Sequence, residues 1–217
     1  MVLCALALAL AVLAVPACAA IGLSLTDGGI RRAFRVALAK RFGAPFTPDA
    51  IVVGDSLAAA CPWRKLFRSP FATLNLAEGG ATIKEIAGQV YRARAIPAPW
   101  LLINGGLNDL LFDAATPERI EADYRALFRR VDTGRKVAVT LMPYVADPEQ
   151  SGRISAANAI LSQLCAERGY AVIDLNPAIA REGVRKPDMT PDGLHFSSKA
   201  EDVWLDVARG LLRAQSV

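Results

Sequence analysis

Short apolar runs alternate along the sequence with segments that carry apolar residues at helical spacing, and this alternation constrains the fold more than any other feature. Short apolar runs bounded by turn residues are typical of buried strands. Strands that alternate with helices predict a parallel sheet covered by helices on both faces. The expected strands are residues 50–53, 71–76, 100–103, 136–141 and 170–175.

The segments between these runs complete the predicted fold. Thr116-Pro117-Glu118 is a typical helix start, with threonine as the N-cap and proline in the first turn. Five strands with intervening helices fit a three-layer, doubly wound α/β fold with a flavodoxin-like parallel sheet. We expect one domain over residues 45–217, because no linker long enough for a further boundary interrupts it. The expected helices are residues 82–92, 117–131, 155–168 and 197–213.

The first 25 residues form an apolar leader, and no charged side chain occurs before Asp27. Such a segment is long enough to span a membrane, whereas the small residues around Cys18 are typical of signal-peptide cleavage. Arg31 and Arg32 follow the apolar run, and by the positive-inside rule this order favours a cytoplasmic domain. A buried core helix is a third interpretation. We expect an exported or membrane-tethered, extracytoplasmic protein, in which any membrane contact is made through residues 1–25.

Residues 26–44 are expected to form an amphipathic helix. Ile30, Phe34 and Leu38 lie at helical spacing, and five basic residues accompany them. Such a helix could rest on a membrane surface. Packing of the helix on the following domain is the interpretation that we favour.

Composition excludes several classes of function. The net charge of +4 is spread along the chain, without the basic stripe and interleaved aromatic residues that nucleic-acid binding requires. His195 is the single histidine, and the four cysteines form no CxxC pair, so we expect no metal site. No glycine-rich phosphate loop follows the first expected strand, so we expect no cofactor. Cys61 and Cys165 could pair, although two buried free thiols are the favoured interpretation.

Polar residues follow the expected strands at the points where such sheets gather function, namely their carboxyl ends. Ester cleavage requires a nucleophile, a base, a group that orients the base, and donors for the developing oxyanion. Ser56 follows the first strand at a turn into a helix, where its own N–H can face an oxyanion. His195 is the only available imidazole, and Asp192 lies three residues before it. The backbone N–H of Gly80 and the side-chain amide of Asn108 could supply further donors.

These residues fall into four blocks, which together resemble the SGNH or GDSL-type hydrolase family. The resemblance covers residues 50–213 and implies that Ser56 is the nucleophile, His195 the base and Asp192 its partner. It also implies an oxyanion hole formed by the N–H of Ser56, Gly80 and Asn108. The blocks are Gly54-Asp55-Ser56, Asn75 to Gly80 with Thr82, Gly106-Leu107-Asn108-Asp109 and Asp192-Gly193-Leu194-His195.

Two positions depart from the family pattern. Ala77 stands where the family often has glycine, so the glycine of the hole could be Gly79, although the spacing to Thr82 favours Gly80. Ala200 stands where glycine often follows the histidine block, which affects only the start of the last helix.

The resemblance implies a serine hydrolase that cleaves a carboxylic ester, such as an acyl or acetyl ester of a small alcohol, sugar or lipid, through an acyl-enzyme on Ser56. An acyltransferase that uses the same acyl-enzyme and a non-catalytic binding module are the alternatives. A receiver-like domain could use Asp55, but it would leave Asn108 and the Asp192/His195 pair unexplained. Substrate-binding residues and oligomeric state stay open. Leu110, Leu111 and Phe112 could line an acyl pocket, although core packing is favoured.

Overall fold

The structure, a computed structural model of the chain, describes residues 47–67, 72–132 and 134–215. The predicted leader (1–25) and amphipathic helix (26–44) lie outside the described residues, as does Phe71 at the start of the second expected strand. Every other predicted element falls within them.

A five-stranded sheet forms the centre of the domain, with strand order β2-β1-β3-β4-β5 and parallel pairing throughout. The predicted parallel sheet is thereby confirmed. Three strands are shorter than expected, because the apolar runs continue beyond the residues that pair. The strands are β1 (Ala50–Val53), β2 (Thr73–Asn75), β3 (Trp100–Ile103), β4 (Lys136–Thr140) and β5 (Ala171–Ile173).

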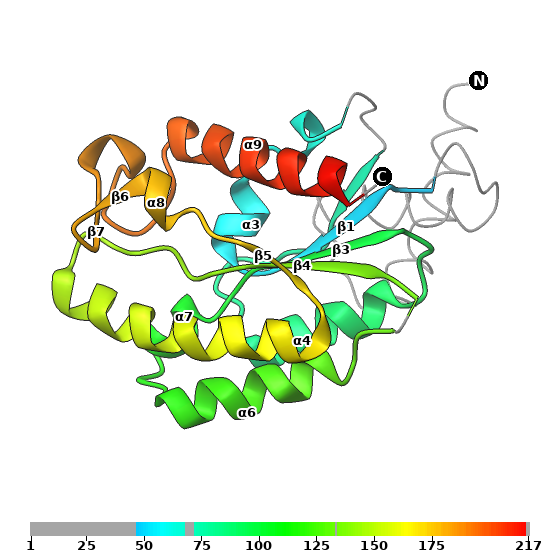
Figure 1. Cartoon of the computed structure of the whole chain (residues 1–217), viewed down its shortest axis with the longest axis horizontal. Helices are drawn as coiled ribbons and strands as arrows, with labels where there is room; N and C mark the ends of the chain where they lie inside the picture. Colours follow the sequence, from blue (N-terminus) through cyan, green and yellow to red (C-terminus); the bar gives the residue numbers. More distant parts are fainter. Residues whose placement is uncertain (1–46, 68–71, 133, 216–217) are drawn as a thin grey trace, which may run out of the picture.

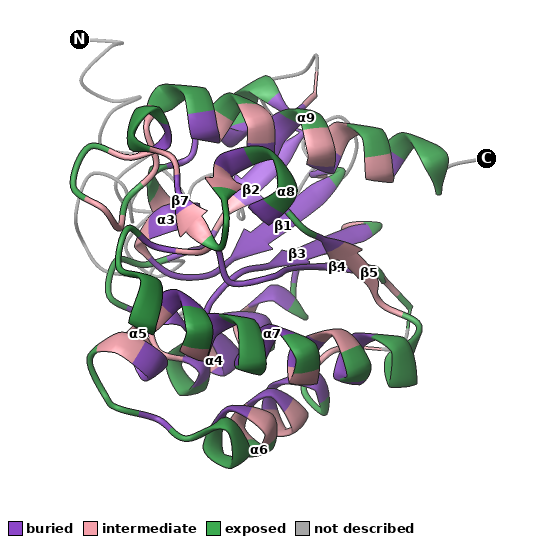
Figure 2. Cartoon of the chain, turned by 60° about the vertical axis from the view of Figure 1, so that its left-hand side comes forward, coloured by how far each residue is buried: buried purple, intermediate pink, exposed green. Residues whose placement is uncertain are grey.

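Helices cover both faces of this sheet and make the predicted three layers (Figure 1). One face carries α3 (Ser56–Ala60) and α9 (Ser198–Ala214). The opposite face carries α4 (Ile83–Ala93), α6 (Pro117–Phe128) and α7 (Pro148–Arg168). Figure 2 shows β1 and β3 buried between these helices, as expected for central strands of a covered sheet, whereas the edge strand β5 is partly exposed.

Local capping explains where the helices begin. The carboxylate of Glu85 accepts a hydrogen bond from the backbone N–H of Thr82, which starts α4. Helix α7 begins seven residues before the predicted start at residue 155, because Asp147 accepts bonds from the N–H groups of Glu149 and Gln150. Pro148 then occupies the first helical position. The apolar pattern does not reveal this start, because the buried residue Ser151 interrupts it.

Several short elements were not predicted. They include α5 (Leu107–Leu111), α8 (Asn176–Ile179) and a small hairpin of β6 (Ala180–Arg181) and β7 (Val184–Arg185). Both residues of the hairpin turn, Glu182 and Gly183, have positive φ angles, of 54° and 77°. Such a pair is typical of the type I′ turn that matches the twist of two-residue hairpins. Two 3-10 turns, Trp63–Lys65 and Pro187–Met189, complete the described elements.

Cys61 and Cys165 are both buried and free. Within residues 47–67, 72–132 and 134–215, no helix is both long and apolar enough to cross a membrane.

Candidate active site

The turn after β1 presents Ser56 as the first residue of α3. Asp55 caps this helix, because its Oδ1 accepts a hydrogen bond from the N–H of Leu57 at 3.0 Å. The side chain of Gln89, from α4, binds both backbone groups of Gly54, the residue before Asp55. Its Oε1 accepts from the N–H of Gly54 at 2.7 Å, and its Nε2 donates to the carbonyl of Gly54 at 3.0 Å. The backbone that carries Ser56 is therefore fixed before any substrate arrives.

Asp55 itself points away from solvent. It is 2% exposed, and the amide of Asn104 donates to its Oδ1 at 2.8 Å. Burial raises the pKa of Asp55 from its ordinary value to about 6. A carboxylate that is buried and occupied in this way is not accessible to a phosphoryl donor, which argues against the receiver-like alternative.

His195 lies between Ser56 and Asp192. Its Nε2 is 3.3 Å from the Oγ of Ser56, and its Nδ1 is 2.7 Å from the Oδ2 of Asp192. Since an ionised carboxylate can only accept, the ring proton is assigned to Nδ1, which leaves the Nε2 lone pair directed at the serine hydroxyl. The structure thus brings Ser56 to the Asp192/His195 pair, which lies far from it in the sequence.

Asp192 is held as an ionised acceptor. The hydrogen bond from the His195 side chain, followed by those from the backbone N–H groups of His195 and Leu194, keeps its pKa well below the usual range. Its Oδ1 accepts these two backbone bonds at 2.7 Å and 3.0 Å. Gly193 makes this tight turn possible, because its φ angle is +86° and a Cβ there would lie 3.1 Å from the Cβ of Ala146.

The glycine block links the serine block to the asparagine block. The N–H of Glu78 donates to the carbonyl of Gly54 at 3.0 Å, and the Nδ2 of Asn108 donates to the carbonyl of Ala81 at 3.0 Å. Gly80, between these two contacts, has a φ angle of +75°, whereas Gly79 has none in the left-handed region. A side chain at Gly80 would be strained even though space is open there, so Gly80 fits the family's glycine better than Gly79.

The third block also anchors two helices. Both carboxylate oxygens of Asp109 accept from the N–H of Ile83, at 3.0 Å and 3.3 Å, so α5 is tied to the start of α4. Leu110 lies in the core, as favoured from the sequence. Phe112 does not, because it is 68% exposed. For Phe112 the expectation of core packing was therefore wrong.

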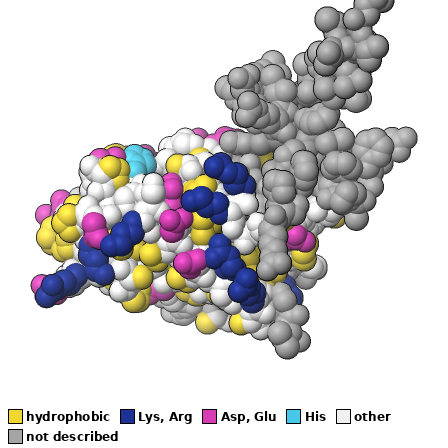
Figure 3. Space-filling view, turned by 90° about the horizontal axis from the view of Figure 1, so that it is seen from above, with side chains coloured by type: hydrophobic (Ala, Val, Ile, Leu, Met, Phe, Trp, Pro, Cys, Tyr) yellow, Lys and Arg dark blue, Asp and Glu magenta, His cyan; other side chains and the backbone are white. Residues whose placement is uncertain are grey.

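The histidine and its carboxylate partner lie open to solvent. The side chains of His195 and Asp192 are 46% and 50% exposed. Figure 3 shows the histidine at the molecular surface.

Three residues that support this site were not found from the sequence: Gln89, Asn104 and Arg185. Gln89 left one usable signal, because it is a polar residue on the otherwise apolar face of α4 and is fully buried there. No local pattern distinguishes Asn104 or Arg185.

Comparison with known proteins agrees with this geometry. The model of the GDSL-like Lipase/Acylhydrolase family matches residues 20–203, and the chain belongs to this family. Among curated proteins, an N-acylneuraminate cytidylyltransferase of Streptococcus agalactiae serotype V is 23% identical over 156 residues, which make up 70% of this chain and 36% of that protein. The chain thus spans about a third of the length of the curated relatives that it matches.

Solved structures share the fold at low sequence identity. A GDSL-like lipase from Bacteroides thetaiotaomicron has a TM-score of 0.65 at 14% identity, over 76% of this chain and 88% of that one. The C-terminal catalytic domain of the peptidoglycan O-acetyltransferase A of Streptococcus pneumoniae has a TM-score of 0.62 at 19% identity, over 78% of this chain and 96% of that one.

Proposed function

We propose that the chain is a serine esterase that cleaves a carboxylic ester through an acyl-enzyme on Ser56. The observation that carries the proposal is the continuous chain of contacts from the Ser56 hydroxyl through His195 to Asp192. Membership of a family of lipases and acylhydrolases supports the same class of reaction.

In the proposed reaction, Nε2 of His195 removes the hydroxyl proton while Oγ of Ser56 attacks the ester carbonyl. Ionised Asp192 stabilises the imidazolium that forms and holds the ring in the required tautomer. The N–H groups of Ser56 and Gly80 and the second amide hydrogen of Asn108 receive the oxyanion. The imidazolium then protonates the leaving alcohol, and water, activated by His195, hydrolyses the acyl-enzyme to release the acid.

The decisive experiment is the hydrolysis of p-nitrophenyl esters of increasing acyl length by the native chain and by Ser56→Ala. We expect Ser56→Ala to lose activity down to, at most, the residual acceleration of about 10³–10⁴-fold that binding and oxyanion groups provide. The native chain, but not the variant, should bind a serine-directed organophosphate covalently. Near-native activity in a folded Ser56→Ala protein would remove the proposal.

A second candidate is acyl transfer to an alcohol, and two observations favour considering it. The site is open to solvent, and the fold is shared with the catalytic domain of a peptidoglycan O-acetyltransferase. The same acyl-enzyme would then be attacked by a sugar or lipid hydroxyl in place of water. Product analysis with and without an added alcohol separates the two, because a transferase forms the new ester in preference to the free acid.

We further propose that residues 1–25 export or tether the chain and that residues 26–44 form an amphipathic helix before the hydrolase domain. The uncharged stretch before Asp27 and the basic residues after it support this arrangement.

A further inference from the structure

Arg185 is a buried cation at the catalytic end of the molecule. It lies on β7, in the small hairpin between α8 and the loop that carries Asp192 and His195, and only 2% of its surface is exposed. Burial lowers the pKa of Arg185 to about 10, which still leaves the guanidinium charged at neutral pH. The Nη2 of Arg185 is buried without a hydrogen-bond partner among the described residues, so the cost of burying the charge is offset by the bonds of Nε and Nη1 and by the charge of Asp192.

The guanidinium joins two segments that are far apart in the sequence. Its Nε donates to the carbonyl of Tyr144, in the loop after β4, at 2.6 Å. Its Nη1 donates to the carbonyl of Leu194 at 2.7 Å and, at the limit of bonding distance, to that of His195 at 3.5 Å. The backbone N–H of Arg185 donates to the carbonyl of Val145 at 3.0 Å, which fixes the base of the side chain to the same loop.

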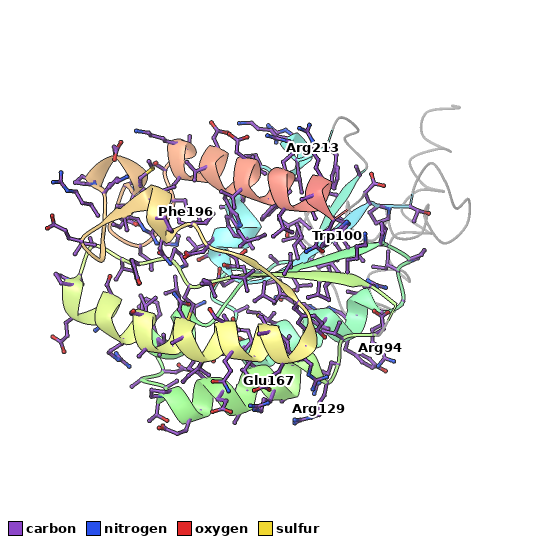
Figure 4. The ribbon with its side chains drawn as sticks, in the orientation of Figure 1. Arg94, Trp100, Arg129, Glu167, Phe196 and Arg213 are labelled. Carbon is purple, nitrogen blue, oxygen red and sulfur yellow. The ribbon has the colours of Figure 1, made fainter. Side chains whose placement is uncertain are left out.

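The guanidinium also lies over the ring of Phe196, the residue that follows the histidine. The Cζ of Arg185 lies 4.8 Å from the ring centroid of Phe196. In Figure 4, Phe196 lies at the end of the molecule where the hairpin and the start of α9 meet, far from Trp100 and Arg213 at the other end. Arg185 therefore contacts three consecutive residues, Leu194, His195 and Phe196.

The half-exposed side chains of Asp192 and His195 need such an anchor, because little packing restrains them on their solvent side. A further bond joins this loop to the loop after β4, from the N–H of Ala146 to the carbonyl of Gly193 at 3.0 Å. An apolar side chain could fill the space of Arg185, but it could not bind carbonyl groups of two segments at once. The planar fork of arginine suits this task better than the single ammonium of lysine.

We propose that Arg185 is a positioning residue of the esterase site: its guanidinium clamps the segment Leu194–Phe196 to the loop after β4 and so keeps the imidazole of His195 within reach of Ser56. This inference rests on the proposed function, since it assigns Arg185 a role in the rate of the same reaction. Arg185 acts through the backbone of the catalytic loop and touches no reacting atom.

The test compares Arg185→Met, Arg185→Lys and the control Arg181→Met. Methionine keeps an unbranched side chain that can still pack on Phe196, but it removes every donor. Lysine keeps the charge and can reach one carbonyl. Arg181 lies on the same hairpin. Its side chain is 82% exposed and, among the described residues, is paired with Glu182 alone, so its replacement should leave activity unchanged.

Rates are expressed per active site, with sites counted by titration of Ser56 with an organophosphate, so that unfolded protein does not enter the rate. We expect Arg185→Met to lower kcat about 10²-fold, the usual loss for a displaced catalytic group, with KM within a factor of about two. Arg185→Lys should show an intermediate loss, and it carries the test alone if the methionine variant does not fold. Because His195 is the only histidine, its imidazole NMR signals are unambiguous, and they should broaden in Arg185→Met but not in Arg181→Met.

An unchanged kcat per titrated site in Arg185→Met would overturn the inference, as would full activity in Arg185→Lys, because charge alone would then suffice. These outcomes differ from failure of the proposed function, which would appear as activity in Ser56→Ala whatever residue occupies position 185.

Discussion

Asp55 lies in the sequence between Gly54, whose backbone Gln89 binds, and Ser56, whose hydroxyl faces His195. Its carboxylate stabilises the turn and does not act on the substrate. Its carboxylate caps α3 and accepts the amide of Asn104, so it fixes Ser56 through the backbone. Burial raises its pKa to about 6, and ionised Asp109 adds a smaller effect in the same direction. Asp55 is therefore largely ionised at neutral pH, at a cost to the stability of the fold.

This cost predicts a pH dependence of stability. The pKa of Asp55 is higher in the folded state, at about 6, than in the unfolded state, at about 3.9, so its contribution is greatest in acid and is lost as the pH rises through about 6. Between pH 4.5 and 7.5, Asp55 should lower the free energy of unfolding by about 2 kcal/mol.

Asp55→Asn should remove this dependence, since an amide does not titrate in this range while its oxygen can still accept both bonds. Urea denaturation of the native chain and the variant at pH 4.5 and 7.5 measures the difference. Asp49→Asn, the same substitution at an exposed position, serves as the control and should keep the native pH dependence. Equal pH dependence in the native chain and Asp55→Asn would show that the burial of Asp55 is not what shifts its titration.

At the scale of elements, the short helix α5 brings the block Gly106 to Asp109 next to the block that ends at Thr82. Asp109 ties α5 to α4, and Asn108 donates one amide hydrogen to the carbonyl of Ala81. The amide carries a second hydrogen, which is the one assigned to the oxyanion. Asn108 therefore has a structural and a proposed catalytic role at once.

The two roles of Asn108 can be separated. We expect Asn108→Ala to lower kcat by about 10²–10³-fold with a small effect on KM, as for the loss of one oxyanion donor. Loss of the bond to Ala81 should lower the free energy of unfolding by only about 1 kcal/mol. Kinetics and urea denaturation of the same sample measure both. An unchanged kcat with reduced stability would assign Asn108 to structure alone.

Some elements of the fold could be predicted from the sequence, and others could not. The sheet and the long helices were predictable because buried strands and capped helices leave local patterns, as at Thr116-Pro117. The meeting of the sequence blocks at one edge of the sheet was predictable, because parallel strands bring their carboxyl ends to the same edge. The hairpin of β6 and β7 was not predictable, because two-residue strands carry no periodicity. The role of Arg185 was not predictable either, because it depends on the carbonyl groups of Tyr144 and Leu194, and Tyr144 is distant in the sequence.

At the scale of the whole molecule, the two ends of the sheet have different tasks. Ser56, Gly80, Asn108 and His195 gather beyond the carboxyl ends of the strands, whereas the described chain enters at Thr47, three residues before the amino end of β1. Trp100 and Arg213 mark that amino end in Figure 4. The proposed ester site and the first described residues therefore lie at opposite ends of the sheet.

Burial makes the thiols of Cys61 and Cys165 unreactive. Burial raises the pKa of Cys165 to about 12 and that of Cys61 still further, so neither thiol forms the reactive thiolate at neutral pH. Two free cysteines are thus compatible with an oxidising compartment, where an exposed thiolate would react.

The proposed export leads to a prediction about location. We expect the full chain, fused at its C-terminus to a reporter that needs disulfides to fold, to be active, because such reporters mature only in an oxidising compartment. A fusion that lacks residues 1–25 should be inactive as a reporter, since the proposed export segment is then missing. The remaining chain should still hydrolyse esters in a lysate. A parallel fusion to a reporter that works only in the cytoplasm supplies the opposite readout. If only this second fusion is active with the full chain, the hydrolase domain lies inside the cell and the proposed export is wrong. The position of Arg31 and Arg32 after the leader would explain that result by the positive-inside rule.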